Sequence, residues 1–312
     1  MDSTPHATML APQGPVPVLR VAGQAFDCGL ELGEAWRMAL RARADEPAAG
    51  AISIFGTPSI IRLFERRVPS LIDLHRGMAR GAGIPETRLF SVHPAGTGSS
   101  GGCTSFAVQP DIALDGTPVS GQTKDTGAER ISQYQVLALS NENGVKLLTL
   151  TYAGWLFGHG FAVSGCSIFR NSLGCGNPGG KLPYDVWGLL AQTCPTVEEA
   201  RELTLDHGVM EGFHCVIADE HGGILGIEAG RNGYAFLAPI NGIYTHTNHV
   251  MSGSPLTECE ENPTYGIDGS HHRQKRLNEL LIRETGRLTV PAAFAALTDH
   301  ANYPDSICSD AR

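Results

Sequence analysis

The chain has 312 residues, of which 42% are hydrophobic and 18% charged, and its formal net charge is −9 at pH 7. This composition suits one large or two modest globular domains, and the acidic balance argues against a nucleic-acid partner, whose phosphates need a basic surface. We expect no membrane segment, because no apolar stretch reaches the roughly 18 residues of a membrane helix, and no signal peptide at the N-terminus.

The first third of the chain is predicted to be mainly helical after a loose tail at residues 1–15. Apolar residues recur at helical spacing over 28–44 and over 71–82, which predicts two helices. Glycines and serines at 96–102 then predict a flexible linker. We therefore expect three segments: the tail 1–15, a helical segment 16–102 and a second segment 103–312.

After Cys103 the pattern changes to short strands and turns. Three hairpins are predicted, with strands at 104–113 and 119–123, at 134–139 and 145–152, and at 213–218 and 224–228, followed by a strand at 243–248. Helices are predicted over 197–206, where Thr196 and Glu199 form a capping box, over 270–286 and over 291–298. Antiparallel strands with segregated helices predict an α+β layered fold.

Eight cysteines are scattered along the chain without a C-x-x-C pair, so their spacing predicts no metal site. Several lie in apolar runs, as at 213–217, which is typical of reduced cysteines in a protein core and indicates a cytoplasmic protein. No phosphate-binding loop and no convincing dinucleotide fingerprint is present, and we expect no cofactor.

The bond between Gly102 and Cys103 is a candidate cleavage site. The preceding glycines leave the carbonyl of Gly102 open to attack by a thiol. Breaking the bond would give Cys103 an α-amine, whose ordinary pKa of about 7.7–8.0 makes it a base beside the thiol. The alternative is a small hydrophobic core cysteine.

Asp125 is predicted to lie near Cys103. A hairpin turn centred on 115–116 places residue 128 opposite Cys103, and a bulge at Pro118 shifts this register by a few residues. A carboxylate at this position could hold the thiol or the new ammonium group. The alternative is a solvated aspartate in a turn.

The run 244–249 contains a second polar cluster. Strand alternation puts His246 and Asn248 on one face, and Thr247 and His249 on the other. An asparagine amide at a strand end could donate to an oxyanion. The alternatives are a cross-strand polar ladder and a satisfied core histidine, and a metal site is not expected because the two histidines point to opposite faces.

Several of these motifs resemble, in their order along the chain, the acyl-CoA:6-aminopenicillanic acid acyltransferase (isopenicillin N acyltransferase) family. They are 102–104, Asp125, 246–249, 270–273 and 302–308, with weaker similarity at Gly23, Gly29, Gly33, 77–82, Asn171 and Glu228. The resemblance implies an N-terminal-nucleophile hydrolase fold, a four-layer αββα sandwich of mostly antiparallel sheets. The helical segment 16–102 would correspond to the α-subunit and the segment 103–312 to the catalytic β-subunit.

The resemblance also implies a chemistry. The precursor would cut itself between Gly102 and Cys103, and the two fragments would form a heterodimer. Cys103 would be the nucleophile, its α-amine the base, Asn248 the oxyanion donor and Asp125 the acidic active-site residue. The remaining polar residues of the motifs, which are His246, Asn171, Glu228 and Arg273, are candidates for a substrate-binding or structural role.

The substrate remains open at this point. Acyl transfer from acyl-CoA to an amine and hydrolysis of a small-molecule amide share the same nucleophile, and choloylglycine hydrolases and penicillin acylases are alternatives within the enzymes. A non-catalytic relative is a further alternative, because the family usually has an arginine after Ser-Ile-Cys that pairs with the acidic residue. This chain has Ser309 there, with Arg312 three residues later, so we expect Asp125 to lack its cation and cleavage to be slow. Family chains also continue into further strands, so we expect either a truncated C-terminus or a diverged C-terminal core.

Overall fold

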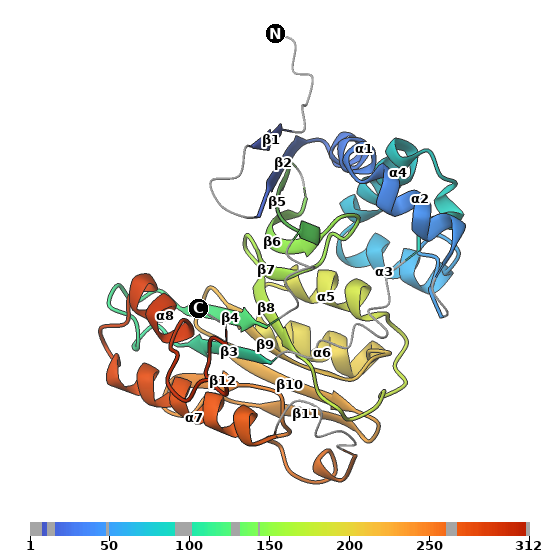
Figure 1. The fold of residues 1–312 in the computed structure, drawn as a ribbon. Helices are drawn as coiled ribbons and strands as arrows, with labels where there is room; N and C mark the ends of the chain where they lie inside the picture. The colour runs from blue at the N-terminus through green and yellow to red at the C-terminus, as the bar shows by residue number, and fades with distance from the viewer. Residues whose placement is uncertain are drawn as a thin grey trace. The chain divides into compact units, whose positions relative to one another are not determined.

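The computed structural model describes residues 8–10, 16–47, 50–90, 102–125, 132–142, 144–259 and 267–309. The contacts divide the chain into two compact units, and each is described by itself (Figure 1). Unit 1 consists of residues 1–96, 129–163 and 182–193, and unit 2 of residues 97–128, 164–181 and 194–312. The segment boundaries at residues 15 and 102 stay predictions, and the predicted linker falls almost entirely outside the described residues.

Unit 1 combines a sheet with a group of helices. Its strands are β1 (Thr8–Leu10), β2 (Val18–Gly23), β5 (Tyr134–Asn141), β6 (Lys146–Tyr152) and β7 (His159–Ala162), paired in that order. The pairing of β2 with β5 is parallel and the others are antiparallel. Its helices are α1 (Ala25–Ala35), α2 (Arg37–Asp45), α3 (Pro58–Arg67), α4 (Ser70–Ala82) and α5 (Tyr184–Gln192), with a short 3₁₀ helix at Glu86–Arg88.

The helix predicted over 28–44 is wrong as a single element. The backbone leaves the helical conformation at Trp36, where φ is −102° and ψ is 14°, and the indole of Trp36 is buried. The bend lets both α1 and α2 contact α4. The helix predicted over 71–82 is confirmed as α4.

Helices α1 and α4 pack through glycines. A Cβ added at Gly29, Gly33, Gly77 or Gly81 would lie 2.0–2.2 Å from a carbonyl oxygen of the facing helix. The backbones therefore touch directly, which no larger residue allows. This packing gives a physical reason for the glycines at 29, 33, 77 and 81.

We expect Gly77→Ala to destabilise unit 1. Alanine in a helix is normally about 1 kcal/mol better than glycine, but here its methyl group would overlap the carbonyl of Phe26. Overpacking of this kind typically costs about 1–3 kcal/mol. Denaturant unfolding should show that loss, whereas Met38→Ala, at an 87% exposed position on α2, should change stability little. An unchanged or higher stability of Gly77→Ala would contradict the close packing.

Unit 2 contains two antiparallel sheets. Strands β3 (Cys103–Val108), β4 (Val119–Lys124) and β12 (Ile243–His246) form a sheet in the order β12-β3-β4. Strands β8 (Cys166–Asn171), β9 (Phe213–Asp219), β10 (Ile224–Gly230) and β11 (Gly233–Leu237) pair consecutively. The helices are α6 (Val197–His207), α7 (Ile267–Arg283) and α8 (Val290–Leu297), with a short 3₁₀ helix at Thr257–Cys259.

The layers of unit 2 follow from strand alternation. Phe106 and Val108 point to one side of β3 and pack with Leu277 and Leu281 of α7 and with α8. Ala107 points to the other side and packs with β9 and β10. Helix α6 contacts β9, and Arg201 of α6 lies over the ring of Phe236 in β11. The order helix, sheet, sheet, helix confirms the predicted α+β fold with αββα layering (Figure 1).

The predicted elements of unit 2 are largely confirmed. The third hairpin is β9 and β10, and the helix predicted over 197–206 is α6, whose Thr196 hydroxyl accepts a hydrogen bond from the Glu199 N–H. The second hairpin is confirmed in unit 1 as β5 and β6. The strand predicted over 243–248 ends at His246.

The register of the first hairpin is shifted by four residues from that of a turn centred on 115–116, and the shift places Asp125 next to the partner of Cys103, as expected. Cys103 lies opposite Lys124 instead of residue 128. Residues 112–114 leave the hairpin to pair with Leu288, because the Leu114 N–H donates to the Leu288 carbonyl and the Leu288 N–H donates to the Ile112 carbonyl. The connection is therefore longer and less symmetric than a tight turn at 115–116.

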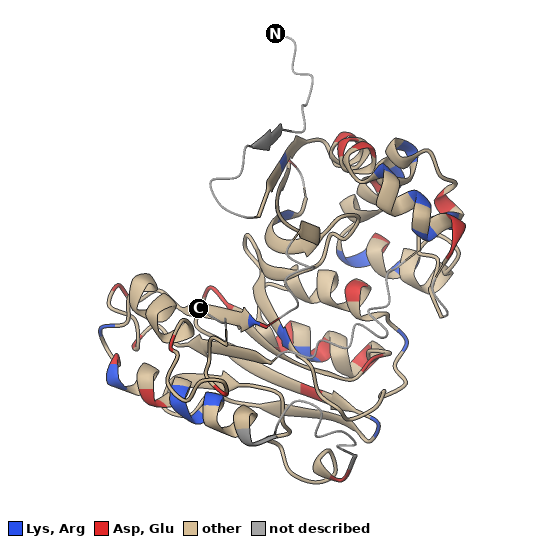
Figure 2. Ribbon diagram, viewed as in Figure 1, with Lys and Arg blue, Asp and Glu red and all other residues tan. Residues whose placement is uncertain are grey.

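Charged residues avoid the centre of the first sheet of unit 2. Strands β3 and β12 carry no Lys, Arg, Asp or Glu, whereas both signs of charge lie along α7 and the helices of unit 1 (Figure 2). In the part of the chain that the structure describes, no helix is long and apolar enough to cross a bilayer. None of the seven cysteines whose side chains are described forms a disulfide.

Candidate active site

Cys103 lies at the start of the central strand β3 and is only 2% exposed. Each polar backbone group around the Gly102–Cys103 bond has a partner. The Gly102 carbonyl accepts a hydrogen bond from the Asp125 N–H at 2.8 Å, and the Cys103 N–H donates to Asn248 Oδ1 at 2.7 Å. The candidate cleavage site is therefore a fixed and polarised peptide bond.

Asn248 reaches Cys103 because it continues the register of β12. His246 pairs with Ser105, so two residues further along Asn248 lies opposite Cys103, and its side chain supplies the acceptor. The Asn248 Nδ2 donates to the Ser172 carbonyl at 3.1 Å, and its backbone N–H donates to Ser270 Oγ at 2.9 Å. The structure thus brings together the two residues to which the resemblance assigns the nucleophile and the oxyanion donor, with Oδ1 toward the Cys103 nitrogen.

Arg273 of α7 joins the site from the other face of β3. Its guanidinium donates to the Cys103 carbonyl at 2.8 Å and to Asn248 Oδ1 at 3.1 Å, and also to Thr104 Oγ1 at 2.9 Å. A Cβ on Gly102 would lie 2.6 Å from Arg273 Cζ. Glycine at 102 therefore lets the guanidinium pack against the backbone, and a larger residue would displace the end of the Arg273 side chain.

Asp125 follows β4 and lies beside the same bond. Burial raises the pKa of its carboxyl, while the positive charge of Arg273 and a hydrogen bond with Ser309 lower it. The charge of Arg273 therefore acts on Asp125 without forming an ion pair among the described contacts, and Ser309, which stands where the family has its arginine, hydrogen-bonds the carboxyl group. Arg312 lies outside the described residues.

We expect Asp125→Asn to slow cleavage and turnover by about 10–100-fold, the cost of a misplaced reacting group. The raised pKa means that Asp125 favours the folded state when protonated, and that this contribution is lost as the pH rises through the raised pKa. The variant should therefore unfold at an equal or higher temperature at pH 7. Slower cleavage together with lost stability would indicate a purely structural role instead.

The thiol of Cys103 is not activated by burial alone. Burial raises its pKa, and the negative charge of Asp125 raises it further. Lys124, Arg273 and a hydrogen bond with the backbone of Ser172 lower it. Burial dominates, so the thiol of the intact chain needs help to form a thiolate.

The other predicted polar residues lie between the two sheets of unit 2. Asn171 Oδ1 accepts from Ser105 Oγ at 2.7 Å, and Asn171 Nδ2 donates to the His246 carbonyl at 3.3 Å. Glu228 lies 2.7 Å from His246 Nε2 and accepts from the N–H groups of Met251 and Ser252. These contacts hold β12 and the loop after it, and thereby position Asn248.

Thr247 and His249 both contact Ser270 of α7, and the His249 ring lies 6.2 Å from the His246 ring, since the strand that would alternate them ends at His246. Thr247 Oγ1 donates to the Ser270 carbonyl at 2.9 Å, and His249 Nδ1 lies 2.8 Å from Ser270 Oγ. Burial lowers the pKa of His249 to about 4, so its ring is neutral at pH 7. No group of three or more metal-ligating side chains occurs among the residues that the structure describes.

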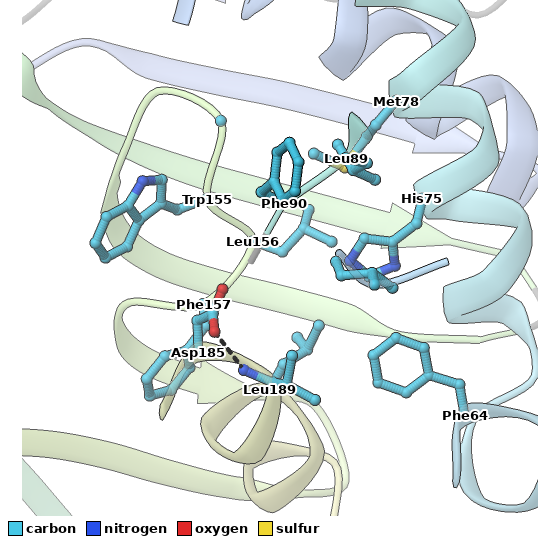
Figure 3. A pocket seen from close by; sticks show the side chains of 13 residues that line it. Phe64, His75, Met78, Leu89, Phe90, Trp155, Leu156, Phe157, Asp185 and Leu189 are labelled. Carbon is cyan, nitrogen blue, oxygen red and sulfur yellow. Dashed lines mark hydrogen bonds between the residues drawn. The ribbon is translucent and has the colours of Figure 1, made fainter. Parts of the chain in front are cut away.

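A separate pocket lies within unit 1 (Figure 3). Its walls are mainly aromatic and aliphatic, with His75 and Asp185 as polar members. Burial lowers the pKa of His75 to about 4, and its Nδ1 donates to the Leu71 carbonyl. The lining contains no nucleophile, so we assign this pocket no step of the chemistry.

Sequence reasoning missed two residues of the site, Lys124 and Ser172, and it gave no role to Ser270, which lies in the motif 270–273. Lys124 lies directly opposite Cys103, Ser172 contacts Asn248 through its carbonyl, and Ser270 holds the backbone of Asn248. A hairpin prediction with the observed register would have placed Lys124 opposite Cys103. A backbone contact such as that of Ser172 leaves no signal in a single sequence.

Comparison with known proteins gives one family and several distant structures. A family model described as acyl-coenzyme A:6-aminopenicillanic acid acyl-transferase matches residues 114–312. No curated protein matches the chain. A Caenorhabditis elegans ortholog of N-acylethanolamine-hydrolyzing acid amidase is 14% identical, with a TM-score of 0.49, over 64% of this chain and 88% of that chain.

Two further solved structures are similar at lower scores. A mutant of the conjugated bile acid hydrolase from Clostridium perfringens is 10% identical, with a TM-score of 0.42, over 63% of this chain and 78% of that chain. Penicillin V acylase from Agrobacterium tumefaciens is 11% identical, with a TM-score of 0.35, over 64% of this chain and 62% of that chain.

Proposed function

Because the chain belongs to the acyl-coenzyme A:6-aminopenicillanic acid acyl-transferase family, we propose that it is a self-processing enzyme that passes an acyl group through a thioester on Cys103. Membership confirms the resemblance found in the motifs. The match includes Asp125, Asn248 and Arg273 but begins after Cys103. The proposed role of Cys103 therefore rests on the hydrogen bonds around the Gly102–Cys103 bond and not on the family match.

The single observation behind this proposal is the hydrogen bonding of the Gly102–Cys103 bond. The Asp125 N–H at 2.8 Å from the Gly102 oxygen can stabilise negative charge on that oxygen. Asn248 Oδ1, 2.7 Å from the Cys103 nitrogen, holds the future amine. Both ends of the bond to be broken are thus fixed by groups suited to the reaction.

Cleavage then proceeds in two steps. The Cys103 sulfur attacks the Gly102 carbonyl carbon, the C–S bond forms, and the C–N bond breaks as the nitrogen takes up a proton. Water hydrolyses the resulting thioester, which leaves a carboxylate on Gly102 and frees the thiol. Cys103 then carries an α-amine with an ordinary pKa of about 7.7–8.0, a base beside the nucleophile.

Turnover reuses the same groups. The thiol attacks the carbonyl of an amide or acyl-CoA, the amine or CoA leaves, and water or an amine takes the acyl group from the thioester. Asn248 Nδ2 is the proposed oxyanion donor, which requires it to leave the Ser172 carbonyl. The α-amine of Cys103 donates a hydrogen bond to Asn248 Oδ1, as the amide nitrogen does in the intact chain.

The two fragments remain together as a heterodimer in this proposal. Within unit 1, β2 of the first fragment pairs with β5 of the second over Val18–Gly23. Cutting after Gly102 leaves this parallel pairing intact. The buried free thiols also support the expected cytoplasmic location.

The substrate class is tested by trapping the acyl group. The protein is incubated with penicillin V, a conjugated bile acid, an N-acylethanolamine, or an acyl-CoA with and without an amine, and the 103–312 fragment is weighed by mass spectrometry. We expect one class to add its acyl mass at Cys103, and Cys103→Ala to add none. Turnover that survives Cys103→Ala would reject the proposed nucleophile, and no acylation with a correctly folded chain would favour a non-catalytic relative.

A further inference from the structure

The strand register places a lysine directly beside the candidate nucleophile. Cys103 and Lys124 are opposite each other on β3 and β4. The adjacent pair, Gly102 and Asp125, shares a backbone hydrogen bond of 2.8 Å. Cys103 and Lys124 therefore form a pair without backbone hydrogen bonds, in which the side chains approach most closely, with Cβ atoms about 4.5–5.5 Å apart.

Cross-strand partners point to the same face of a sheet, so the lysine stem lies alongside the thiol. The neighbours of Lys124 on this face of β4 are directed toward β8. Gln122 Nε2 donates to the Arg170 carbonyl, and Ser120 Oγ lies 2.8 Å from Ser167 Oγ. Lys124 is half-buried at the end of this row, where its charge is poorly screened by solvent.

Three charged side chains act on the Cys103 thiol, namely Lys124, Asp125 and Arg273. After burial, which raises the pKa of the thiol, Lys124 has the largest effect, and it lowers that pKa. Arg273 acts in the same direction more weakly, and its guanidinium donates to the Cys103 carbonyl, Thr104 and Asn248. Asp125 acts in the opposite direction.

The intact chain makes this lysine important. Before cleavage the nitrogen of Cys103 is an amide that donates to Asn248, so the α-amine that serves as base in turnover does not yet exist. We propose that the ammonium group of Lys124 stabilises the Cys103 thiolate and thereby activates it for attack on the Gly102 carbonyl. This inference rests on the proposed function.

The step balances without a further reactant. The thiol loses its proton to water, and Lys124 stays protonated beside the thiolate throughout. The sulfur forms its bond to the Gly102 carbon, the C–N bond breaks, and water returns a proton to the Cys103 nitrogen. Lys124 acts only through its charge, so arginine should replace it and glutamine should not.

The test measures the pH dependence of Cys103 alkylation by iodoacetamide. Wild type, Lys124→Gln and Lys124→Arg are labelled from pH 5 up to the highest pH at which circular dichroism shows each variant folded, and mass spectrometry follows the peptide that contains Cys103. This peptide differs between intact and cleaved chains, so each form is measured separately. The control is Lys275→Gln, at an exposed lysine on α7.

We expect the midpoint of labelling to rise by about one pH unit or more in Lys124→Gln, since an opposite charge at this range shifts a pKa by about 1–3. Self-cleavage at pH 7 should slow about tenfold, and Lys124→Arg and Lys275→Gln should resemble wild type. An unchanged midpoint in Lys124→Gln, or an equal rise in Lys124→Arg, would overturn the proposal. Should Lys124→Gln fail to fold, Lys124→Met is read in the same way.

The labelling result is independent of the proposed function. If wild type never cleaves but the midpoint depends on the charge at 124, the lysine activates the thiol and self-processing is wrong. If wild type cleaves and the pH midpoint of labelling does not change with the charge at position 124, self-processing stands and the lysine proposal is wrong.

Discussion

Cys103→Ala is expected to remain a single chain of 312 residues, whereas the wild-type protein separates into fragments of 102 and 210 residues. Without the sulfur no thioester can form, and the hydrogen bonds of Asp125 and Asn248 to the backbone cannot break the peptide bond by themselves. A denaturing gel with intact mass measurement distinguishes the two outcomes.

The matched control for this variant is Cys215→Ala. Cys215 is equally buried in unit 2 and lies on β9, but it makes no contact with the Gly102–Cys103 bond among the described hydrogen bonds. It should cleave like wild type. If Cys103→Ala cleaves at the wild-type rate, the whole self-processing mechanism is wrong.

Asn248→Ala is expected to lower kcat by about 10²–10³-fold, the usual cost of losing one oxyanion donor. Asn248→Asp separates the two roles of this side chain. It keeps an acceptor for the Cys103 nitrogen but removes the Nδ2 donor, so we expect it to retain more cleavage than Asn248→Ala and to lose turnover to a similar degree.

Asn232→Ala provides the control, because Asn232 is an asparagine of unit 2 whose Nδ2 donates to the Pro255 carbonyl in an exposed position. Steady-state kinetics, together with circular dichroism for each variant, should show a loss only at 248. Normal turnover of folded Asn248→Asp would assign Asn248 to positioning of the Cys103 nitrogen alone.

Local patterns were enough to predict α4, α6, α7, α8 and the β5–β6 and β9–β10 hairpins, but not α3, α5 or the strands β2, β8 and β11. The Thr196 cap and the turn at 221–223 depend on a few neighbouring residues, and α6 and the β9–β10 hairpin follow from them. The order of layers followed from the αββα resemblance and from alternation in β3. The bend at Trp36 could not be predicted, because it depends on how two helices pack on α4.

The residues of the candidate site were easier to predict than the contacts between them. Asp125 was predicted to lie near Cys103, and the resemblance gave Asn248 a role in the same chemistry. The symmetric hairpin register was four residues off, because residues 112–114 pair with Leu288, far along the chain. For that reason Lys124 was not predicted to lie opposite Cys103. The contact of Arg273 with Cys103 spans 170 positions, and helix periodicity alone gives no sign of it.

The parallel pairing of β2 with β5 has a consequence for how this protein is made. As one chain, the protein brings the two strands together in a unimolecular reaction, with the covalent link supplying a high effective concentration. If the chain cleaves as proposed, the same pairing joins two molecules, and recovery of the fold from denaturant becomes bimolecular and depends on protein concentration. A cleaved form should then owe its persistence to slow unfolding more than to reversible equilibrium, because cleavage would remove the covalent link that made assembly unimolecular.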